Sequence, residues 1–172
     1  MQPIPFTVDS ALLSELGERL VGKPHIALAE LVKNSYDADA KKVIIRFGDD
    51  RIEVLDNGQG MDFADFENFG MRIGSPHKQE KRVSRNLKRP MTGSKGVGRL
   101  AVQFLANKIE LCTVSEKNLD SELRAHVNWN EAVKAGDLTK ATAFYEQVAA
   151  EAEFPDKSPN GTFIILSGLK QK

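Results

Sequence analysis

The residues best placed to do chemistry lie along one face of a predicted helix. Glu30, Asn34 and Asp37 are spaced i, i+4 and i+7, and an α-helix of about 3.6 residues per turn brings such positions onto one stripe. A carboxylate can orient and polarise a water molecule for attack on a phosphoryl group, and an amide oxygen is a hard donor suited to Mg²⁺. A charged stripe is more often simply a solvated helix face, so its meaning depends on the segments that follow.

Two glycine-rich segments come after this stripe. The first, Asp-Asn-Gly-Gln-Gly-Met over residues 56–61, directly follows an apolar strand, and the second, Gly-Ser-Lys-Gly-Val-Gly over residues 93–98, directly precedes an apolar helix. Glycine lets a backbone approach a ligand closely, and a helix N-terminus offers unpaired N–H groups and a positive dipole end to phosphate. The second segment lacks the Gly-Lys-Ser/Thr ending of a Walker loop and the strand-first context of a dinucleotide-binding turn.

Four short segments, in this order, resemble the nucleotide-binding boxes of the gyrase, chaperone, histidine-kinase and mismatch-repair (GHKL) ATPase superfamily. They are the helix with Glu30 and Asn34, the two glycine-rich segments, and Gly161-Thr162 at the start of the last predicted strand. The resemblance extends from about residue 24 to about residue 166. It implies the Bergerat fold, and it implies ATP and Mg²⁺ as ligands.

The resemblance implies a role for each residue that matches a box. Glu30 stands where hydrolysing members carry an acidic general base, Asn34 where they carry the magnesium ligand, and Asp56 where an aspartate accepts a hydrogen bond from the adenine amino group. An ionised carboxylate only accepts, so it discriminates adenine's amino group from guanine's carbonyl. The other residues expected around the nucleotide are Asp37, Gly58, Gly60, Met61, Gly93, Lys95, Gly96, Val97, Gly98 and Thr162.

Among these, the glycine-segment residues are expected to shape the pocket. Gly58 and Gly60 leave room for the base, and Met61 offers it a soft apolar wall. Lys95 adds a positive charge near the terminal phosphates.

The remaining polar residues are expected to support the site from a distance. Asp37 is expected in a second layer around the nucleotide, with a role at the helix C-terminus as the alternative. Thr162 is expected to support Asp56 through its hydroxyl or a bridging water. Asp39 is expected to be a surface residue at the end of the helix.

Hydrophobic periodicity predicts the elements that position these residues. Helices are predicted over 11–20, from Pro24, over 62–70, from Gly98 and over 139–152, and strands over 43–47, 52–56, 108–114, 122–129 and 162–166. Polar and apolar residues alternate strictly over 122–129, which puts Leu123 on the buried face of that strand and Glu122 on the exposed face. The order predicts an α/β (α+β) two-layer sandwich, with helices on one face of a mixed, mostly antiparallel sheet.

A long segment between the two glycine-rich boxes is predicted to be a flexible lid, over about residues 71–95. It has two prolines and many polar residues, and its apolar residues follow neither helical nor strand periodicity. Long loops of this kind in compact domains are often functional. Its basic side chains either contact phosphate or a partner, or are simply solvated. They are Lys78, Lys81, Arg82, Arg85, Lys88 and Arg89.

The composition indicates one soluble domain over residues 1–172. The 24 Lys plus Arg residues balance the 24 Asp plus Glu residues, which disfavours a surface built wholly for nucleic acid and leaves such contact to a larger assembly. Cys112 alone permits no internal disulfide, fits a reducing compartment, and lies in an apolar run as a buried structural thiol would. No stretch reaches the roughly 18–20 apolar residues that span a bilayer, so the predicted location is cytoplasmic.

The expected function is Mg²⁺-dependent ATP hydrolysis, with a lid that couples nucleotide state to a partner or a second copy of the chain. In hydrolysing relatives a further domain carries a lysine that reaches the γ-phosphate, whereas this sequence ends soon after Leu166. Slow turnover is therefore expected, as is an origin in the N-terminal part of a larger protein. One alternative is a nucleotide-gated interaction module with little hydrolysis. Another is a histidine-kinase catalytic domain, which Glu30 and the absence of a phosphoacceptor helix disfavour.

Overall fold

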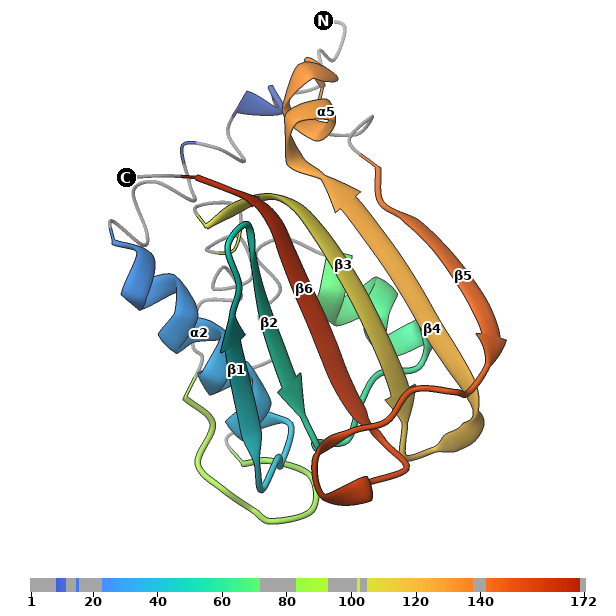
Figure 1. Ribbon diagram of the computed structural model, residues 1–172. Coiled ribbons are helices and arrows are strands. Elements are labelled where there is room, and N and C mark those ends of the chain that lie inside the picture. Colours follow the sequence, from blue (N-terminus) through green and yellow to red (C-terminus); the bar gives the residue numbers. More distant parts are fainter. Residues whose placement is uncertain are drawn as a thin grey trace, which may run out of the picture.

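A six-stranded antiparallel sheet forms the frame of the molecule (Figure 1). The computed structural model describes residues 9–11, 15, 23–71, 83–92, 102, 105–137 and 142–170. Its elements are α2 (Pro24–Asp37), β1 (Val43–Phe47), β2 (Arg51–Asp56), α3 (Phe63–Asp65), the π-helix η1 (Phe66–Met71), β3 (Ala106–Ser115), β4 (Asn118–Asn128), α5 (Trp129–Lys134), β5 (Phe144–Ala149), the 3-10 helix η4 (Pro155–Lys157) and β6 (Gly161–Leu169).

The strand order brings the end of the chain into the middle of the sheet. The strands lie in the order β1-β2-β6-β3-β4-β5, and every pairing in the described part of the chain is antiparallel. Asp56 at the end of β2 pairs with Thr162 near the start of β6, and Thr162 pairs in turn with Thr113 of β3. Three polar side chains from distant parts of the sequence therefore lie in one row across the sheet.

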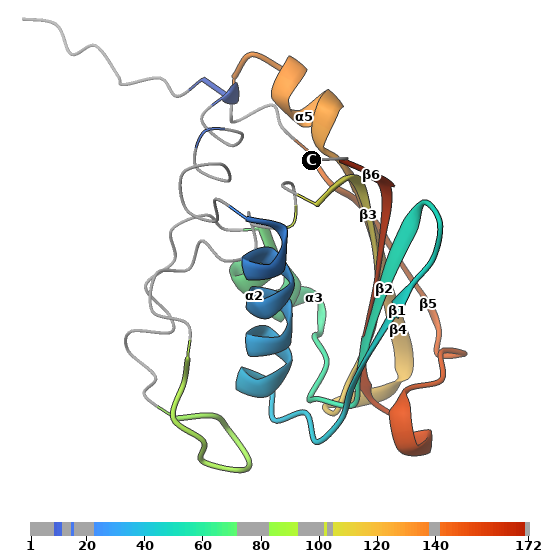
Figure 2. The ribbon, with the colours of Figure 1, turned by 60° about the vertical axis from the view of Figure 1, so that its left-hand side comes forward.

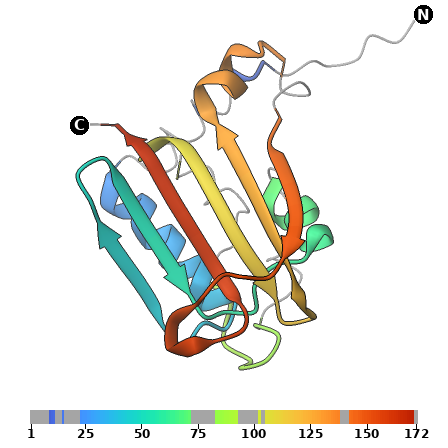
Figure 3. The same cartoon turned by 45° about the vertical axis from the view of Figure 1, so that its right-hand side comes forward.

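Helices α2 and α3 cover one face of this sheet, as Figure 2 shows, while Figure 3 shows the strands from the face that these two helices leave uncovered. The two-layer arrangement predicted from the sequence is therefore confirmed. The apolar side of α2 packs on the strands to form the main core, since burying one helix face against a sheet is what stabilises such a layer. The buried members of this core are Ala27, Leu31, Ile52, Val54, Val102, Leu105, Ala106 and Leu166.

Most predicted elements are present within the described residues. The hairpin over 43–56 and the strands β3, β4 and β6 overlap the predicted ranges, although β4 already begins at Asn118 and Trp129, predicted in that strand, begins α5. Pro24 begins α2 as expected for the first helical turn. The predicted helix over 11–20 lies largely outside the described residues. At its start, Asp9 Oδ1 accepts the N–H of Ala11 at 2.8 Å, while the Ser10 hydroxyl donates to the Val133 carbonyl at 2.6 Å.

The helix predicted over 139–152 is wrong, because its central part is the edge strand β5. Phe144, Tyr145 and Val148 are aromatic and β-branched residues that suit a pleated strand, although their spacing also fits a helix. The pairing with β4 decides between the two, since β5 pairs with β4 from Ser121↔Ala149 to His126↔Phe144. Tyr145 then stacks on Phe63 of α3, with ring centroids 4.7 Å apart.

Candidate functional site

Asp56 is the buried centre of the candidate site. Its Oδ1 accepts the backbone N–H of Gly58 at 2.8 Å, its Oδ2 accepts the hydroxyl of Ser35 at 2.7 Å, and the residue is 6% exposed. Burial raises the pKa of Asp56 above its ordinary value, and the hydrogen bonds from Ser35 and from the backbones of Gly58 and Thr162 offset only part of this effect. The carboxylate is thus oriented on both oxygens and largely withdrawn from water.

Ser35 was not singled out in the sequence, yet it joins α2 to the end of β2. The buried side of α2 runs through Ala27, Leu31 and Ser35, which are spaced i, i+4 and i+8. Val32, the apolar residue next to Leu31, is 37% exposed. A serine in line with two core residues is a buried hydroxyl that needs a partner, and this was the signal in the sequence. Its partner is Asp56.

Thr113 is a second residue of the candidate site that the sequence did not reveal. Its fully buried hydroxyl donates to the Gly161 carbonyl at 2.8 Å, accepts the backbone N–H of Met61 at 3.0 Å, and lies 3.3 Å from the hydroxyl of Thr162. The Thr162 hydroxyl therefore contacts Thr113. The link of Thr162 to Asp56 runs through its backbone, in the pairing of β6 with β2 and in a hydrogen bond to the Asp56 carboxylate. These threonines join three strands beneath the Asp56 loop, residues 56–61.

The glycines of the Asp56 loop are needed because backbones meet there. A Cβ at Gly58 would lie 2.8 Å from the Ala38 carbonyl oxygen, and a Cβ at Gly60, where φ is +65°, would lie 1.9 Å from the Val114 carbonyl oxygen. A Cβ at Gly161 would lie 2.2 Å from the Asp56 carbonyl oxygen. Close packing of the chain on itself thus requires glycine here, and room for a base at Gly58 and Gly60 stays a prediction.

Substituting Gly60 by alanine should destabilise the protein by about 2–4 kcal/mol, since a steric clash with backbone adds to the left-handed conformation. Gly136 is the matched control, because its φ is +72° but a Cβ would meet nothing within 4 Å. Gly136→Ala should therefore cost only about 1 kcal/mol. Urea denaturation of both variants measures the difference. Equal losses would mean that strain alone, and no clash, makes glycine necessary at Gly60.

The predicted stripe on α2 is present, with different surroundings for its members. Glu30 Oε1 forms an ion pair with Lys33 Nζ at 2.5 Å, and the Glu30 side chain is 24% exposed. Asn34 lies half-buried on the next turn, directly before Ser35. Asp37 is buried, and its Oδ1 accepts both the N–H of Thr92 at 2.8 Å and the hydroxyl of Thr92 at 2.9 Å.

Residues 83–92, here called the strap, are the described part of the predicted lid. The strap lies at the C-terminal end of α2 (Figures 1 and 2). The Arg89 guanidinium donates to the Ala40 carbonyl at 2.6 Å and lies 4.8 Å from the centroid of the Tyr36 ring. Arg85 pairs with Glu116 at 3.4 Å. These two basic side chains therefore contact the protein itself, Arg89 at a carbonyl-rich helix end that favours a cation and Arg85 at the turn between β3 and β4.

Several predicted site residues lie outside the described part of the chain. They are Gly93, Lys95, Gly96, Val97 and Gly98.

Within the described residues, no group of three or more His, Cys, Asp or Glu side chains is placed to hold a metal ion. A single amide oxygen such as that of Asn34 suits Mg²⁺ that arrives with phosphate oxygens and waters, since this ion commonly takes only one or two protein ligands.

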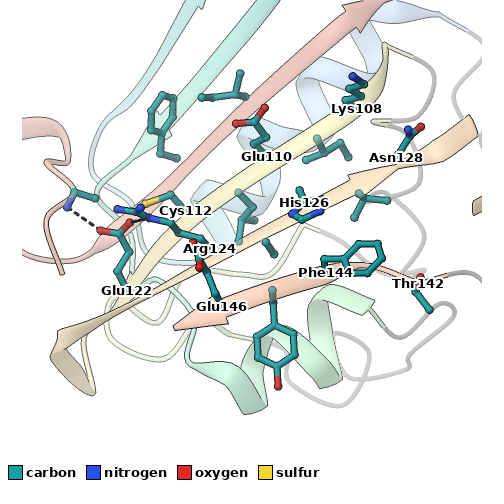
Figure 4. A pocket seen from close by; sticks show the side chains of 18 of the residues that line it. Lys108, Glu110, Cys112, Glu122, Arg124, His126, Asn128, Thr142, Phe144 and Glu146 are labelled. Carbon is teal, nitrogen blue, oxygen red and sulfur yellow. Dashed lines mark hydrogen bonds and ion pairs between the residues drawn. The ribbon is translucent and has the colours of Figure 1, made fainter. Parts of the chain in front are cut away.

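The uncovered face of the sheet carries a broad hollow of about 1180 Å³ (Figure 4). Lys108, Glu110, Arg124, His126 and Phe144 are among the side chains that line it. Strand alternation turns Asp56, Thr113 and Thr162 to the other face, so this hollow is separate from the candidate site.

Glu122, predicted on the exposed face of its strand, is 1% exposed. Its carboxylate accepts the backbone N–H groups of Glu151 and Ala152 at 3.0 and 2.9 Å and the Arg124 Nε–H at 2.5 Å. The segment after β5 therefore covers a residue that alternation alone would leave in water. Burial and the nearby Glu122 raise the pKa of the half-buried Cys112 thiol to about 12, which agrees with a structural role.

In the part of the chain that the structure describes, none of the helices combines the length and apolar character needed to cross a lipid bilayer.

Comparison with known proteins finds a family and a solved structure that match most of this chain. Residues 22–157 match the model of a family described as histidine kinase-, DNA gyrase B- and HSP90-like ATPases. A solved structure, the crystal structure of the N-terminal domain of a DNA repair protein, superposes with a TM-score of 0.57 at 18% identity, covering 92% of this chain and 39% of that one. At that identity the likeness concerns the fold, which agrees with the predicted Bergerat architecture.

Two sequences show related stretches. A protein of Herpetosiphon aurantiacus named "Putative type II restriction enzyme HgiDII" is 36% identical over 161 residues, which are 92% of this chain and 25% of the relative. The DNA mismatch repair protein pms1 of Schizosaccharomyces pombe is 47% identical over 49 residues, which are 27% of this chain and 6% of the relative. The chain thus spans a quarter or less of the length of either relative.

Proposed function

Because the chain belongs to the family of histidine kinase-, DNA gyrase B- and HSP90-like ATPases, we propose that it binds ATP with Mg²⁺ and hydrolyses it. The observation that carries this proposal is Asp56, a buried carboxylate oriented by Ser35 and Gly58 at the end of β2. A carboxylate offers about four acceptor sites, and the donors from Ser35, Gly58 and the Thr162 backbone leave capacity for one amino group. An acceptor of this kind suits the exocyclic amine of adenine and opposes the carbonyl of guanine.

The stripe on α2 supports the hydrolytic part of the proposal. Asn34 would hold Mg²⁺ through its amide oxygen, and the ion would neutralise charge on the phosphates. Glu30 accepts a proton from the attacking water, whose oxygen forms a bond to the γ-phosphorus while the bond to the ADP oxygen breaks. Lys33 pairs with Glu30 and so holds the carboxylate on the helix surface.

We further infer that this ATPase step serves a larger protein or assembly. A relative named as a restriction enzyme and another named as a mismatch repair protein are both far longer than this chain. Their names favour a partner that acts on DNA, reached through other domains or a second copy of the chain. The balanced formal charge of the chain itself agrees with an indirect contact with nucleic acid.

The test is calorimetric titration of ATP and GTP into the protein, with and without Mg²⁺, followed by a phosphate-release assay on the same samples. ATP should bind, bind more tightly with Mg²⁺, and release phosphate slowly, whereas GTP should bind much more weakly. Binding of ATP without phosphate release would replace the hydrolase with a nucleotide-gated interaction module. Failure of ATP to bind would overturn the proposal.

A further inference from the structure

Asp39 is a buried residue in a conformation that aspartate seldom adopts. It follows the C-terminal end of α2 with φ at +63° and is 7% exposed, so the expectation of a surface residue is wrong. The left-handed region is unfavourable for residues that carry a Cβ, although less so for aspartate and asparagine than for others. A strained, buried carboxylate at a helix end, where negative charge is also unfavourable, points to a function for its oxygen atoms.

The Asp39 carboxylate joins two segments that are distant in sequence. Its Oδ2 accepts the side-chain amide of Gln59 in the Asp56 loop and the backbone N–H of Asn86 in the strap, at 2.7 Å. Burial raises the pKa of Asp39, but the hydrogen bonds from the strap and from Gln59 outweigh burial and lower it below the ordinary value. The carboxylate is therefore ionised at neutral pH, and both donors bind the same oxygen atom.

The hydrogen bonds of Asp39 to Gln59 and Asn86 belong to a closed ring of hydrogen bonds. The Gln59 carbonyl accepts the N–H of Glu116 at 2.8 Å, and Glu116 Oε2 accepts the side-chain amide of Asn86 at 2.8 Å. Asn86 returns to Asp39 through its backbone. The end of α2, the Asp56 loop, the turn between β3 and β4, and the strap are thus linked through four residues.

The strap is itself held together and fixed at a second point. The N–H of Ser84 donates to the Arg89 carbonyl at 2.8 Å, and the N–H of Arg89 donates to the Ser84 hydroxyl at 2.9 Å. Thr92, at its far end, is bound by Asp37. The strap is thus tied to Asp39 at Asn86 and to Asp37 at Thr92, and Thr92 precedes the second glycine-rich segment in the sequence.

We propose that Asp39 is a positioning residue that couples the Asp56 loop to the strap, so that a nucleotide bound at Asp56 fixes the strap against the end of α2. This inference rests on the proposed binding of ATP. Binding of the base orders residues 56–61, including Gln59. Because Gln59 and Asn86 donate to the same Asp39 oxygen, the ordered Gln59 also fixes Asn86 of the strap. Asp39 itself touches neither base nor phosphate.

Two variants separate the carboxylate from the backbone strain. Asp39→Gly removes the acceptor and also the cost of positive φ, so the protein should stay folded. Asp39→Asn keeps one acceptor oxygen and tolerates the left-handed region, so it should restore part of the coupling. Amide hydrogen exchange, measured with and without saturating ATP and Mg²⁺, follows the Asp56 loop, the strap and β6 separately.

In the wild type, ATP should slow exchange in both the Asp56 loop and the strap. In Asp39→Gly, strap amides should exchange about tenfold faster, as expected for a locally opened segment, and ATP should protect the loop without protecting the strap. Exchange in β6 should not change. Protection of the strap by ATP in Asp39→Gly, or parallel acceleration in β6, would overturn the inference alone. A wild-type loop that ATP does not protect would instead refute the proposed function, and the inference with it.

Discussion

Replacing Glu30 by glutamine should reduce steady-state ATP hydrolysis by about 10²–10⁴-fold, the usual contribution of a positioned general base. Glutamine has nearly the same shape but cannot take a proton from the attacking water. The ion pair that it loses, with Lys33, is partly exposed and should contribute little to stability. ATP affinity, measured by calorimetry, should therefore stay within a few-fold of the wild type while phosphate release nearly disappears.

Lys33→Gln is the matched control for this variant. It removes the same ion pair from α2 but leaves the Glu30 carboxylate in place, so turnover should persist. Equal losses in the two variants would assign the effect to the ion pair rather than to proton transfer. Unchanged turnover in Glu30→Gln would show that Glu30 is a solvated helix carboxylate and that hydrolysis needs another base.

Asp56→Asn should lower ATP affinity by about 100-fold or more. A carboxamide has only one acceptor oxygen. Its NH₂ group would therefore face a donor from Ser35, from Gly58 or from the adenine amine, and two donors cannot bond to each other. Each buried donor left without an acceptor costs about 1–3 kcal/mol. Calorimetric titration measures the loss. Affinity close to that of the wild type would mean that Asp56 does not read the base.

The same variant should show an unusual pH dependence of stability. Burial raises the pKa of Asp56 in the folded protein, so folding favours the protonated form. The stability that Asp56 contributes is full below its unfolded pKa and declines as pH rises through the folded pKa. Asp56→Asn lacks this decline, and its free energy of unfolding should improve relative to the wild type from acidic to neutral pH.

Asp62 provides a control with the opposite sign. Hydrogen bonding to Lys117 lowers the pKa of Asp62, so its contribution to stability is present above the unfolded pKa and is lost as pH falls through the folded pKa. Asp62→Asn should therefore lose stability relative to the wild type as pH rises from acidic to neutral. Urea denaturation at a series of pH values compares both variants, and trends of the same sign would contradict the assignment for Asp56.

The parts of the site that the sequence predicted are those set by local spacing. The i, i+4 spacing of Glu30 and Asn34 fixes their common helix face, and the hairpin places Asp56 at the end of a strand, whatever the rest of the chain does. Ser35 and Thr113 were not identified, because their partners lie far away in the sequence and become neighbours only through the sheet order.

The errors in prediction have the same physical origin. Asp39 follows a helix end, which is usually solvated, but the Asp56 loop and the returning strap cover it. Glu122 was predicted to be exposed because strand alternation contains no information about the segment that later covers it. The segment around Tyr145 had helical spacing, but an available edge on β4 made it a strand. In each case a long-range contact outweighed a local preference.

The position of β6 has a consequence for how the chain acquires its site during synthesis. Until residues 161–169 leave the ribosome, β2 and β3 each lack the neighbour that stands between them, and Thr162 cannot join Asp56 to Thr113. A nascent chain that ends before β6 exposes two unpaired strand edges, which are prone to association. On the proposed function, bound nucleotide would stabilise the nascent domain only after β6 has been inserted.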